Sequence, residues 1–297
     1  MCSFFHRHRY ARIMLRATVV VLVLSCIGLV CAFQSLDDVR GFVLRDAAEN
    51  GNLARVKWLL KGHPDIVDNK SNRKWTALYW AVVSDHTDVV AYLLANKADV
   101  NAKTDNGDSL LHMAAYLGNE KMAELLLAHG ADVNAEDNHG GTPLNAAKSN
   151  VVELLLAHGA NIEAKDNAPG GGGNTPLGST AAGGDKAKVE LLLAHGAEVN
   201  AKGNSGLTPL HFAAQGEKDM AELLLEHGAN VDARDSNGDT PMHLAAMMGF
   251  KDEAKLLLDY KADVNARDKQ GISPLGWAEQ DGHKELAEML RQHGGHE

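Results

Sequence analysis

The sequence predicts an all-α solenoid of stacked helix-turn-helix units with projecting β-hairpin loops. Two observations predict it. A motif resembling Thr-Pro-Leu-His recurs seven times at intervals of 33 or 32 residues, and a leucine-rich block recurs between its copies. One unit of this length buries too little apolar surface to be stable alone, so neighbouring units must stack around a continuous core.

The first block marks the start of a helix. Thr or Ser supplies the N-cap, and Pro, where it is present, stands in the first turn, where its missing N–H is harmless. The Ala-Ala pair that follows in several copies allows neighbouring helices to approach closely. The seven copies begin at Thr76, Ser109, Thr142, Thr175, Thr208, Thr240 and Ser273.

The second block predicts a second helix and its end. Three successive leucines form its core face, and a glycine then suits the left-handed residue that ends a helix. The stretch after it, with turns such as Asn106-Gly107, predicts the hairpin loop. The helix-ending positions are Lys97, Gly130, Gly159, Gly196, Gly228, Lys261 and Gly294.

Together these residues resemble the ankyrin repeat, from about Trp75 to the C-terminus. The resemblance implies an ankyrin-repeat solenoid that recognises folded partner proteins on its concave surface. We expect an N-terminal capping helix pair at residues 33–72 and seven ankyrin-like repeats at 73–297, the last of which is a C-terminal cap. The repeats start near residues 73, 106, 139, 172, 205, 237 and 270.

One repeat is irregular. The helix-ending positions Gly130 and Gly159 are only 29 residues apart, whereas Gly159 and Gly196 are 37 apart. The loss of four residues falls near Ala146–Val152 and removes about one helical turn. The gain is the run Gly170–Gly173, a flexible loop extension without the Lys-Ser or Lys-Thr of a phosphate-binding loop. We therefore expect the stack to be weakest at Asn145–Val152.

Residues 1–32 have the layout of a secretory signal peptide: a basic stretch, an apolar run at 17–32, and the small residues Val30 and Ala32. We expect cleavage after Ala32 and a secreted or periplasmic protein. Two alternatives stay open. The 16 apolar residues fall just short of a membrane span and could anchor the chain. Lipidation of Cys26 is the other, because that residue stands in a loosely lipobox-like context.

Composition excludes several classes of function. All three cysteines lie within the first 31 residues, so the body holds no thiol for a disulfide, a nucleophile or a zinc site. Residues 33–297 contain 25 basic and 39 acidic residues, a net charge of −14. Such a body repels phosphate backbones, which argues against nucleic acid and favours a basic protein partner.

The 15 histidines are the candidates for metal binding or catalysis, and their places in the repeat explain most of them. His112, His211 and His243 belong to the capping motif, whereas His129, His158, His195 and His227 directly precede a helix-ending glycine. Stacked helices lie about 8–10 Å apart, too far for neighbouring imidazoles to share zinc at about 2.0–2.1 Å. We expect no metal, no cofactor, no small-molecule substrate and no catalytic residues; a cryptic hydrolase is the remote alternative.

The leading hypothesis is a monomeric, non-catalytic scaffold that binds a protein partner; an exported inhibitor or protector of one enzyme is the alternative. In ankyrin-like repeats the two positions after the Ala-Ala pair and the hairpin tips face the partner. A competing interpretation is that the apolar residues among them pack against neighbouring helices. The resemblance implies the candidates Tyr116, Leu117, Gln215, Met247, Met248 and Gln280 on helices, with Asp105, Asp137 and Asp235, and beside them Asp108 and Asp239, as an acidic rim.

Overall fold

A computed structural model describes residues 36–71, 73–167 and 172–297. The expected signal peptide, and with it Cys26 and the cleavage site at Ala32, lies outside the described residues, as do Gly170 and Gly171 of the glycine run. Within the described ranges the regular structure is helical, apart from one isolated antiparallel bridge between Lys103 and Ser109. The fold is all-α, as the sequence predicts.

In the described part of the chain the helices form eight consecutive pairs, and a short 3-10 helix, η1 (Pro64–Ile66), follows the first pair. The pairs are α2 (Leu36–Glu49) and α3 (Leu53–Gly62), α4 (Ala77–Val83) and α5 (Thr87–Ala95), α6 (Leu110–Leu117) and α7 (Glu120–Ala128), α8 (Pro143–Ala146) and α9 (Ser149–Ala157), α10 (Pro176–Gly183) and α11 (Lys186–Ala194), α12 (Pro209–Ala213) and α13 (Lys218–Glu226), α14 (Pro241–Met248) and α15 (Lys251–Asp259), and α16 (Pro274–Gln280) and α17 (Lys284–Gln292).

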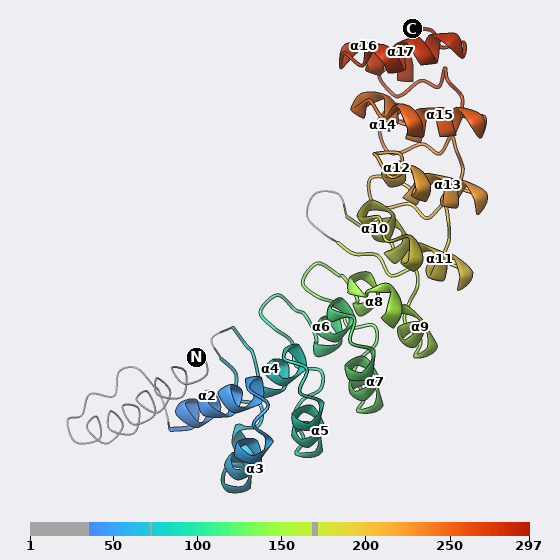
Figure 1. Cartoon of the computed structure of the whole chain (residues 1–297). Coiled ribbons are helices and arrows are strands. Elements are labelled where there is room, and N and C mark those ends of the chain that lie inside the picture. The colour runs from blue at the N-terminus through green and yellow to red at the C-terminus, as the bar shows by residue number, and fades with distance from the viewer. Residues whose placement is uncertain (1–35, 72, 168–171) are drawn as a thin grey trace, which may run out of the picture.

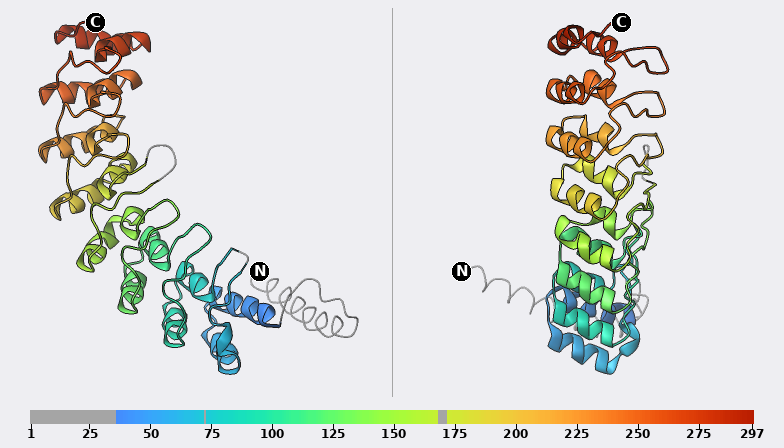
Figure 2. Two further views of the ribbon diagram at one scale, coloured as in Figure 1. Left: turned by 180° about the vertical axis from the view of Figure 1, so that it is seen from behind. Right: turned by 90° about the vertical axis from the view of Figure 1, so that its right-hand side faces the viewer.

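The pairs stack side by side into one curved body (Figure 1). The first helix of each pair lies on the inner side of the curve and the second on the outer side, and the long loops project from the inner side (Figure 2). The inner helices and loops therefore form a concave face, which we call the inner face.

Local sequence signals explain the helix boundaries. Ser109, Thr208 and Thr240 each cap an inner helix, and the histidine three residues later completes a reciprocal capping box. At the other end, the helix-ending glycines adopt the left-handed backbone that the sequence predicts, with φ of 85° at Gly130. Lys97 and Lys261 take the same conformation, with φ of 66° and 68°.

The core is continuous from one end of the stack to the other. Each pair contributes small residues from the inner helix and larger ones from the outer helix, such as Ala114, Ala115 and Leu126, all at most 1% exposed. The alanines lie where consecutive inner helices meet, so their small side chains permit the close stacking that the repeat requires.

The loops reverse direction without forming strands in the described residues, beyond the bridge at Lys103 and Ser109. The expected β-hairpins are therefore hairpin-shaped turns. Their polar groups bond elsewhere: Asp137 closes its own loop through its carboxylate, and the N–H of Asn138 donates to the carbonyl of Asn106 in the preceding loop at 3.0 Å. Bonds between loops thus add to the backbone bonds within each loop, such as that from the N–H of Asp137 to the carbonyl of Gly141 at 2.9 Å.

The irregular repeat appears as the spacing predicts. α8 has only four residues and ends at Ala146; its C-cap, Ala147, has an extended backbone (ψ 140°) that leads directly to the N-cap of α9 at Lys148. The N–H of Lys148 donates to the carbonyl of Ala115 at the end of α6, 3.1 Å away. The shortened inner helix is thus joined to the preceding repeat by a backbone hydrogen bond.

Candidate functional site

The candidate surface is the inner face, and the first apolar patch on it lies at the end of α6. Tyr116 is 63% exposed and Leu117 is 40% exposed. Both directly follow the buried pair Ala114 and Ala115, and Gly118, with φ of 72°, ends the helix after them. Two large hydrophobic side chains are therefore held in solvent by a rigid helix end.

A second apolar patch lies at the equivalent place on α14. Met248 is 58% exposed, while Met247 is half-buried beside it. Packing against neighbouring helices, the competing interpretation, therefore applies in part to Met247 and not to Tyr116, Leu117 or Met248. The inner face thus offers exposed apolar anchors on two helices that are four repeats apart.

Small and polar residues separate the two patches. The end of α10 exposes Ala182 and Gly183, and Gln215 after α12 is half-buried and donates to the carbonyl of His211 at 3.1 Å. Gln280 at the end of α16 is exposed. The structure therefore places the helix-borne candidates along one face without bringing the two apolar patches together.

The expected acidic rim is only partly present. Asp105 is exposed at its loop tip, but Asp137 and Asp235 are half-buried, and each uses Oδ1 to accept two backbone N–H groups of its own loop. Asp239 is buried, with 6% exposure, and Asp108 is half-buried beside Thr104. Asx turns of this kind stabilise the loops, so Asp137 and Asp235 serve loop structure first.

Buried Asp239 has an unusual environment. Its Oδ1 has no hydrogen-bond partner. Burial, together with the nearby carboxylates of Asp235 and Asp268, raises the pKa of Asp239 from 3.8 to about 6. A negative charge at this position is therefore unfavourable in the folded protein.

Side chains on the loops tie consecutive repeats together. The Nζ of Lys103 donates to the carbonyl of Glu136, and the Nζ of Lys202 donates to that of Arg234, each at 2.8 Å. At the base of the loops, Asn134 donates to the carbonyl of Gly159 and accepts from the N–H of Asn161. These loops are therefore hydrogen-bonded to the loops of neighbouring repeats along the inner face.

The three capping-motif histidines are structural. His112 Nδ1 accepts from the N–H of Ser109 at 3.2 Å, and its Nε2 donates to the carbonyl of Gly141 in the next loop at 2.9 Å. His211 and His243 make the equivalent bridges, to Asp239 and Ile272. Burial lowers the pKa of all three imidazoles, which favours the neutral tautomer that these bonds require.

The helix-ending histidines also have internal partners. His129, His158, His195 and His227 each bring Nδ1 to 2.9 Å from the carbonyl four residues earlier. In the part of the chain that the structure describes, no group of three or more His, Cys, Asp or Glu side chains is placed to hold a metal ion.

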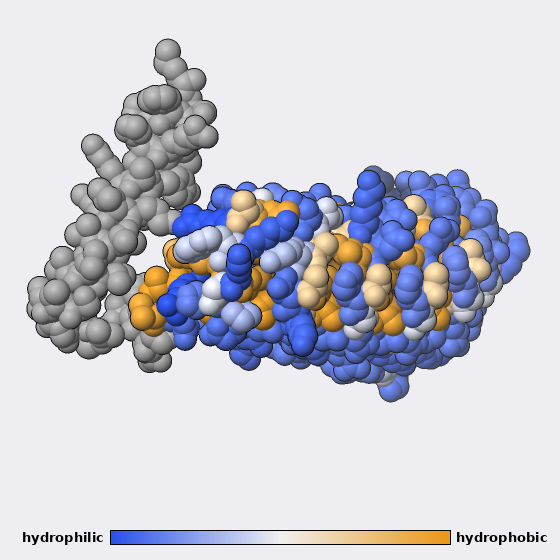
Figure 3. Space-filling view, turned by 90° about the horizontal axis from the view of Figure 1, so that it is seen from below, coloured by the Kyte–Doolittle hydropathy of each residue, from blue (hydrophilic) through white to orange (hydrophobic). Residues whose placement is uncertain are grey.

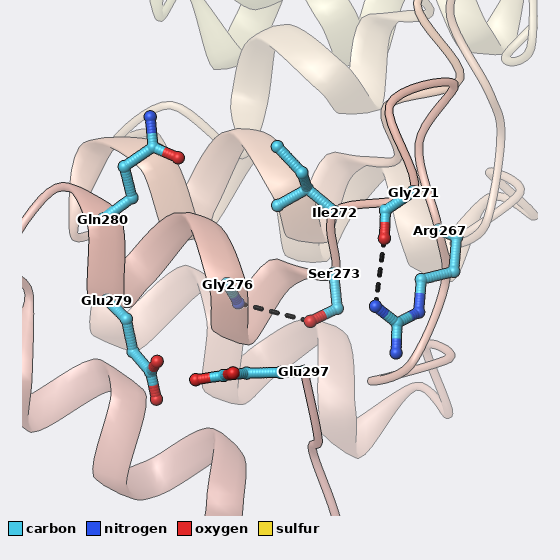
Figure 4. A pocket seen from close by; sticks show the side chains of 8 residues that line it. All are labelled: Arg267, Gly271, Ile272, Ser273, Gly276, Glu279, Gln280 and Glu297. Carbon is cyan, nitrogen blue, oxygen red and sulfur yellow. Dashed lines mark hydrogen bonds between the residues drawn. The ribbon is translucent and has the colours of Figure 1, made fainter.

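A shallow hollow of about 500 Å³ lies at the C-terminal end, lined by Arg267, Ser273, Glu279 and Glu297 among others (Figure 4). The Ser273 hydroxyl donates to the carbonyl of His296 at 3.0 Å and accepts from the N–H of Gly276 at 3.2 Å. Arg267 donates to the carbonyl of Gly271. The serine hydroxyl is thus occupied by backbone groups, and no histidine is among the described residues that line this hollow.

An aromatic cluster on the inner side was not anticipated from the sequence. The Trp75 ring stacks on Tyr79 at 5.3 Å between centroids and meets Trp80 edge-on at 5.0 Å, with the Arg73 guanidinium 5.4 Å from the Trp75 ring. Trp80 stands four residues after its N-cap, as Met113 does in the next repeat. The fourth residue after the N-cap is thus a further position at which the sequence indicates apolar surface, and it extends that surface into α4.

Comparison with known proteins fits this geometry. The chain matches the family described as ankyrin repeats (three copies) over residues 44–137, 97–166, 144–235 and 229–297. The chain belongs to the ankyrin repeat family. Ankyrin repeats are in general protein-protein interaction modules.

Similar curated proteins match over short stretches. Human ankyrin repeat domain-containing protein 53 is 36% identical over 94 residues, 29% of this chain and 18% of that protein. Human ankyrin repeat domain-containing protein 40 is 35% identical over 65 residues, 22% of this chain and 18% of that protein. Alpha-latrocrustotoxin-Lt1a of Latrodectus tredecimguttatus is 42% identical over 59 residues, 20% of this chain and 4% of the toxin. The chain spans less than a fifth of each relative.

Proposed function

We propose that this ankyrin-repeat protein is a non-catalytic scaffold that binds one partner protein on its inner face. The observation that carries the proposal is the exposure of Tyr116, Leu117 and Met248 at two rigid helix ends of that face. Aromatic residues and methionine are enriched at the centres of protein interfaces, where their burial provides most of the binding free energy.

The charge of the molecule favours a basic partner. Residues 76–297 contain 17 basic and 33 acidic residues. An excess of carboxylates accelerates encounter with a basic protein and makes the association rate dependent on salt. An inhibitor or protector of one enzyme is the second candidate; it differs from a general scaffold in capturing a single enzyme at equal stoichiometry.

The test is affinity purification from the native host, followed by mass spectrometry of the bound proteins. The wild-type protein is compared with a Tyr116→Ser/Met248→Ser variant and with a Tyr260→Ser control, since Tyr260 is an exposed aromatic residue at the end of the outer helix α15. A partner retained by wild type and control and lost by the double variant supports the inner face. A partner that all three proteins retain would place the binding site elsewhere.

We also propose export by residues 1–32 with cleavage after Ala32, from the basic, apolar and small-residue order of that segment. N-terminal sequencing of the protein from its host should begin at Phe33. An intact N-terminus on membrane-bound protein would favour the anchor instead. In the described residues, no helix combines the length and the apolar character that crossing a bilayer requires.

A further inference from the structure

The outer helix of the first pair differs from every other outer helix in charge. α3 carries Arg55, Lys57 and Lys61 and has no acidic residue. Each of the other seven outer helices in the described chain contains at least one Asp or Glu. The first pair thus presents a cationic helix on an otherwise acidic protein.

An exposed tryptophan lies between these lysines. Trp58 is 75% exposed, more than any other large hydrophobic side chain in the described residues. Counted from the N-cap of each outer helix, Trp58 stands at the first leucine position, which is held elsewhere by half-buried residues such as Tyr92 and Leu125. Lys57, one residue earlier, stands where five of the other seven outer helices carry a glutamate: Glu124, Glu153, Glu190, Glu222 and Glu288. The exposed side of α3 therefore carries a cation where most repeats carry a carboxylate.

Lys57, Trp58 and Lys61 share the outward side of α3, because residues three and four apart lie on one side of a helix. Lys61 is exposed, and the Nζ of Lys57 lies 5.4 Å from the ring centroid of Tyr92 on α5. We call Lys57, Trp58 and Lys61 the α3 patch. Its helix, α3, is an outer helix and lies on the side of the stack away from the loops (Figure 1).

The first repeat and the rest of the molecule differ in the sign of their net charge. Residues 36–75 hold eight basic and six acidic residues, a net charge of +2, whereas residues 76–297 have a net charge of −16. A negatively charged surface therefore attracts the first repeat and repels the remainder. Seen from the side of the early outer helices, hydrophobic residues reach the edge of the molecule at this same end (Figure 3).

The charge and the tryptophan of the α3 patch indicate its occupant. Three residues separate Ala32 from Leu36, where α2 begins. A link of that length reaches at most about 14 Å, so wherever residues 17–32 stay uncleaved and anchor the chain, the alternative to cleavage after Ala32, the first pair is kept near the bilayer surface. Tryptophan prefers the interface between lipid and water, and lysines nearby bind anionic headgroups.

We propose that the α3 patch contacts the surface of an anionic lipid bilayer. Lys57 and Lys61 bind the headgroups, and the Trp58 ring enters the interface between headgroups and acyl chains. The first repeat then lies on the membrane while the inner face stays open to a protein partner. This contact is independent of the partner-binding role of Tyr116 and Met248, which lie on the other side of the stack.

The test measures contact between Trp58 and lipid in the full chain. The protein is reconstituted into phosphatidylcholine vesicles with or without phosphatidylglycerol, each containing a lipid brominated near the headgroup, which quenches tryptophan fluorescence on contact. The Trp58 signal is the difference between wild type and Trp58→Phe. We expect it to be quenched in the vesicles with phosphatidylglycerol and relieved by high salt.

The charge variants separate the patch from the apolar run. Lys57→Gln/Lys61→Gln keeps the run and should reduce the quenching by at least about fivefold, since each lysine is worth about that factor in binding to an anionic surface. Lys251→Gln/Lys255→Gln on α15 removes the same charge far from the membrane and should change nothing. Both sites are exposed, and circular dichroism checks the fold.

Two outcomes would overturn the proposal. The first is an unquenched Trp58 in phosphatidylglycerol vesicles, which leaves the patch free for an acidic protein instead. The second is quenching that is equal with and without phosphatidylglycerol and in both lysine variants, since Trp58 would then be placed by the apolar run alone.

Discussion

The ammonium group of Lys188 donates a hydrogen bond to the main-chain carbonyl of Asn145, 2.9 Å away, across the junction between the shortened repeat and the next one. Lys188 is buried, with 4% exposure, at a repeat position that is filled by Val89, Met122 and Met220 elsewhere. Asn145 ends the capping box of the four-residue helix α8, and its Nδ2 is buried without a partner. A lysine thus compensates for the missing helical turn by satisfying a carbonyl that the helix no longer reaches.

Lys188 should make stability rise at alkaline pH. Burial lowers its pKa from 10.5 to about 8, so between these values the unfolded chain binds more protons than the folded one. Stability therefore increases as pH rises from about 8 to 10.5, by up to roughly 3 kcal/mol. Urea unfolding at several pH values should show this rise in wild type and not in Lys188→Met. An equal rise in stability in both proteins would show that groups other than Lys188 cause the pH dependence.

The junction at Lys188 is also the expected place of local opening. The histidine bridge to the next loop is present at His112, His211 and His243, while Asn145 and Gly178 stand at the same repeat position. Fewer links between repeats lower the free energy of local opening. Amide hydrogen exchange should be faster in α8 and α9 than in α6 and α7. Equal protection across these four helices would contradict the expectation.

Asp239 should destabilise the protein at neutral pH. Its pKa is raised from 3.8 to about 6, so the folded state binds more protons between these values and stability falls as pH rises through that window. Asp239→Asn should unfold at a higher temperature than wild type at pH 7, with the difference shrinking near pH 4. Asp235→Asn is the contrasting variant: it weakens two loop hydrogen bonds and should be less stable than wild type at pH 7.

The helix-ending lysines predict a reciprocal pair of substitutions. Lys97 holds a left-handed φ of 66°, whereas the equivalent Gly130, at 85°, has open space where a Cβ would lie. A side chain in this conformation costs about 1 kcal/mol, so Lys97→Gly should stabilise the protein and Gly130→Lys should destabilise it by similar amounts. Thermal unfolding measures both. Changes of the same sign in the two variants would mean that local contacts outweigh backbone strain.

Much of the fold follows from the sequence because its determinants are local and repeated. Ser109 and Thr208 cap the helices that the spacing predicts, and Gly130 ends one as expected. Which carboxylates of the acidic rim are free could not be predicted for a physical reason. Asp137 bonds to its own loop in an Asx turn, although the sequence around it resembles that around a free surface carboxylate. The role of Lys188 becomes visible in the sequence only when its position is compared across repeats, where it interrupts a mainly apolar column.

The last prediction concerns whether Tyr116 and Met248 serve binding or folding. They are 63% and 58% exposed, so replacing them removes little buried surface, and exposed substitutions usually change stability by less than about 0.5 kcal/mol. Tyr116→Ala and Met248→Ser should therefore unfold at nearly the wild-type temperature. Leu111→Ala on the same helix as Tyr116 is the matched contrast: Leu111 is 1% exposed, and its truncation should cost about 2–5 kcal/mol.

Affinity for the captured partner should show the opposite order. Truncating Tyr116 together with Met248 should weaken binding by roughly 1–3 kcal/mol because interface anchors lose their burial against the partner. Leu111→Ala should retain normal affinity wherever it remains folded, since the side chain lies beneath the surface. Normal binding by the double variant would show that neither residue belongs to the interface. Unfolding of that variant at a clearly lower temperature than wild type would show that the two side chains contribute to the core despite their exposure.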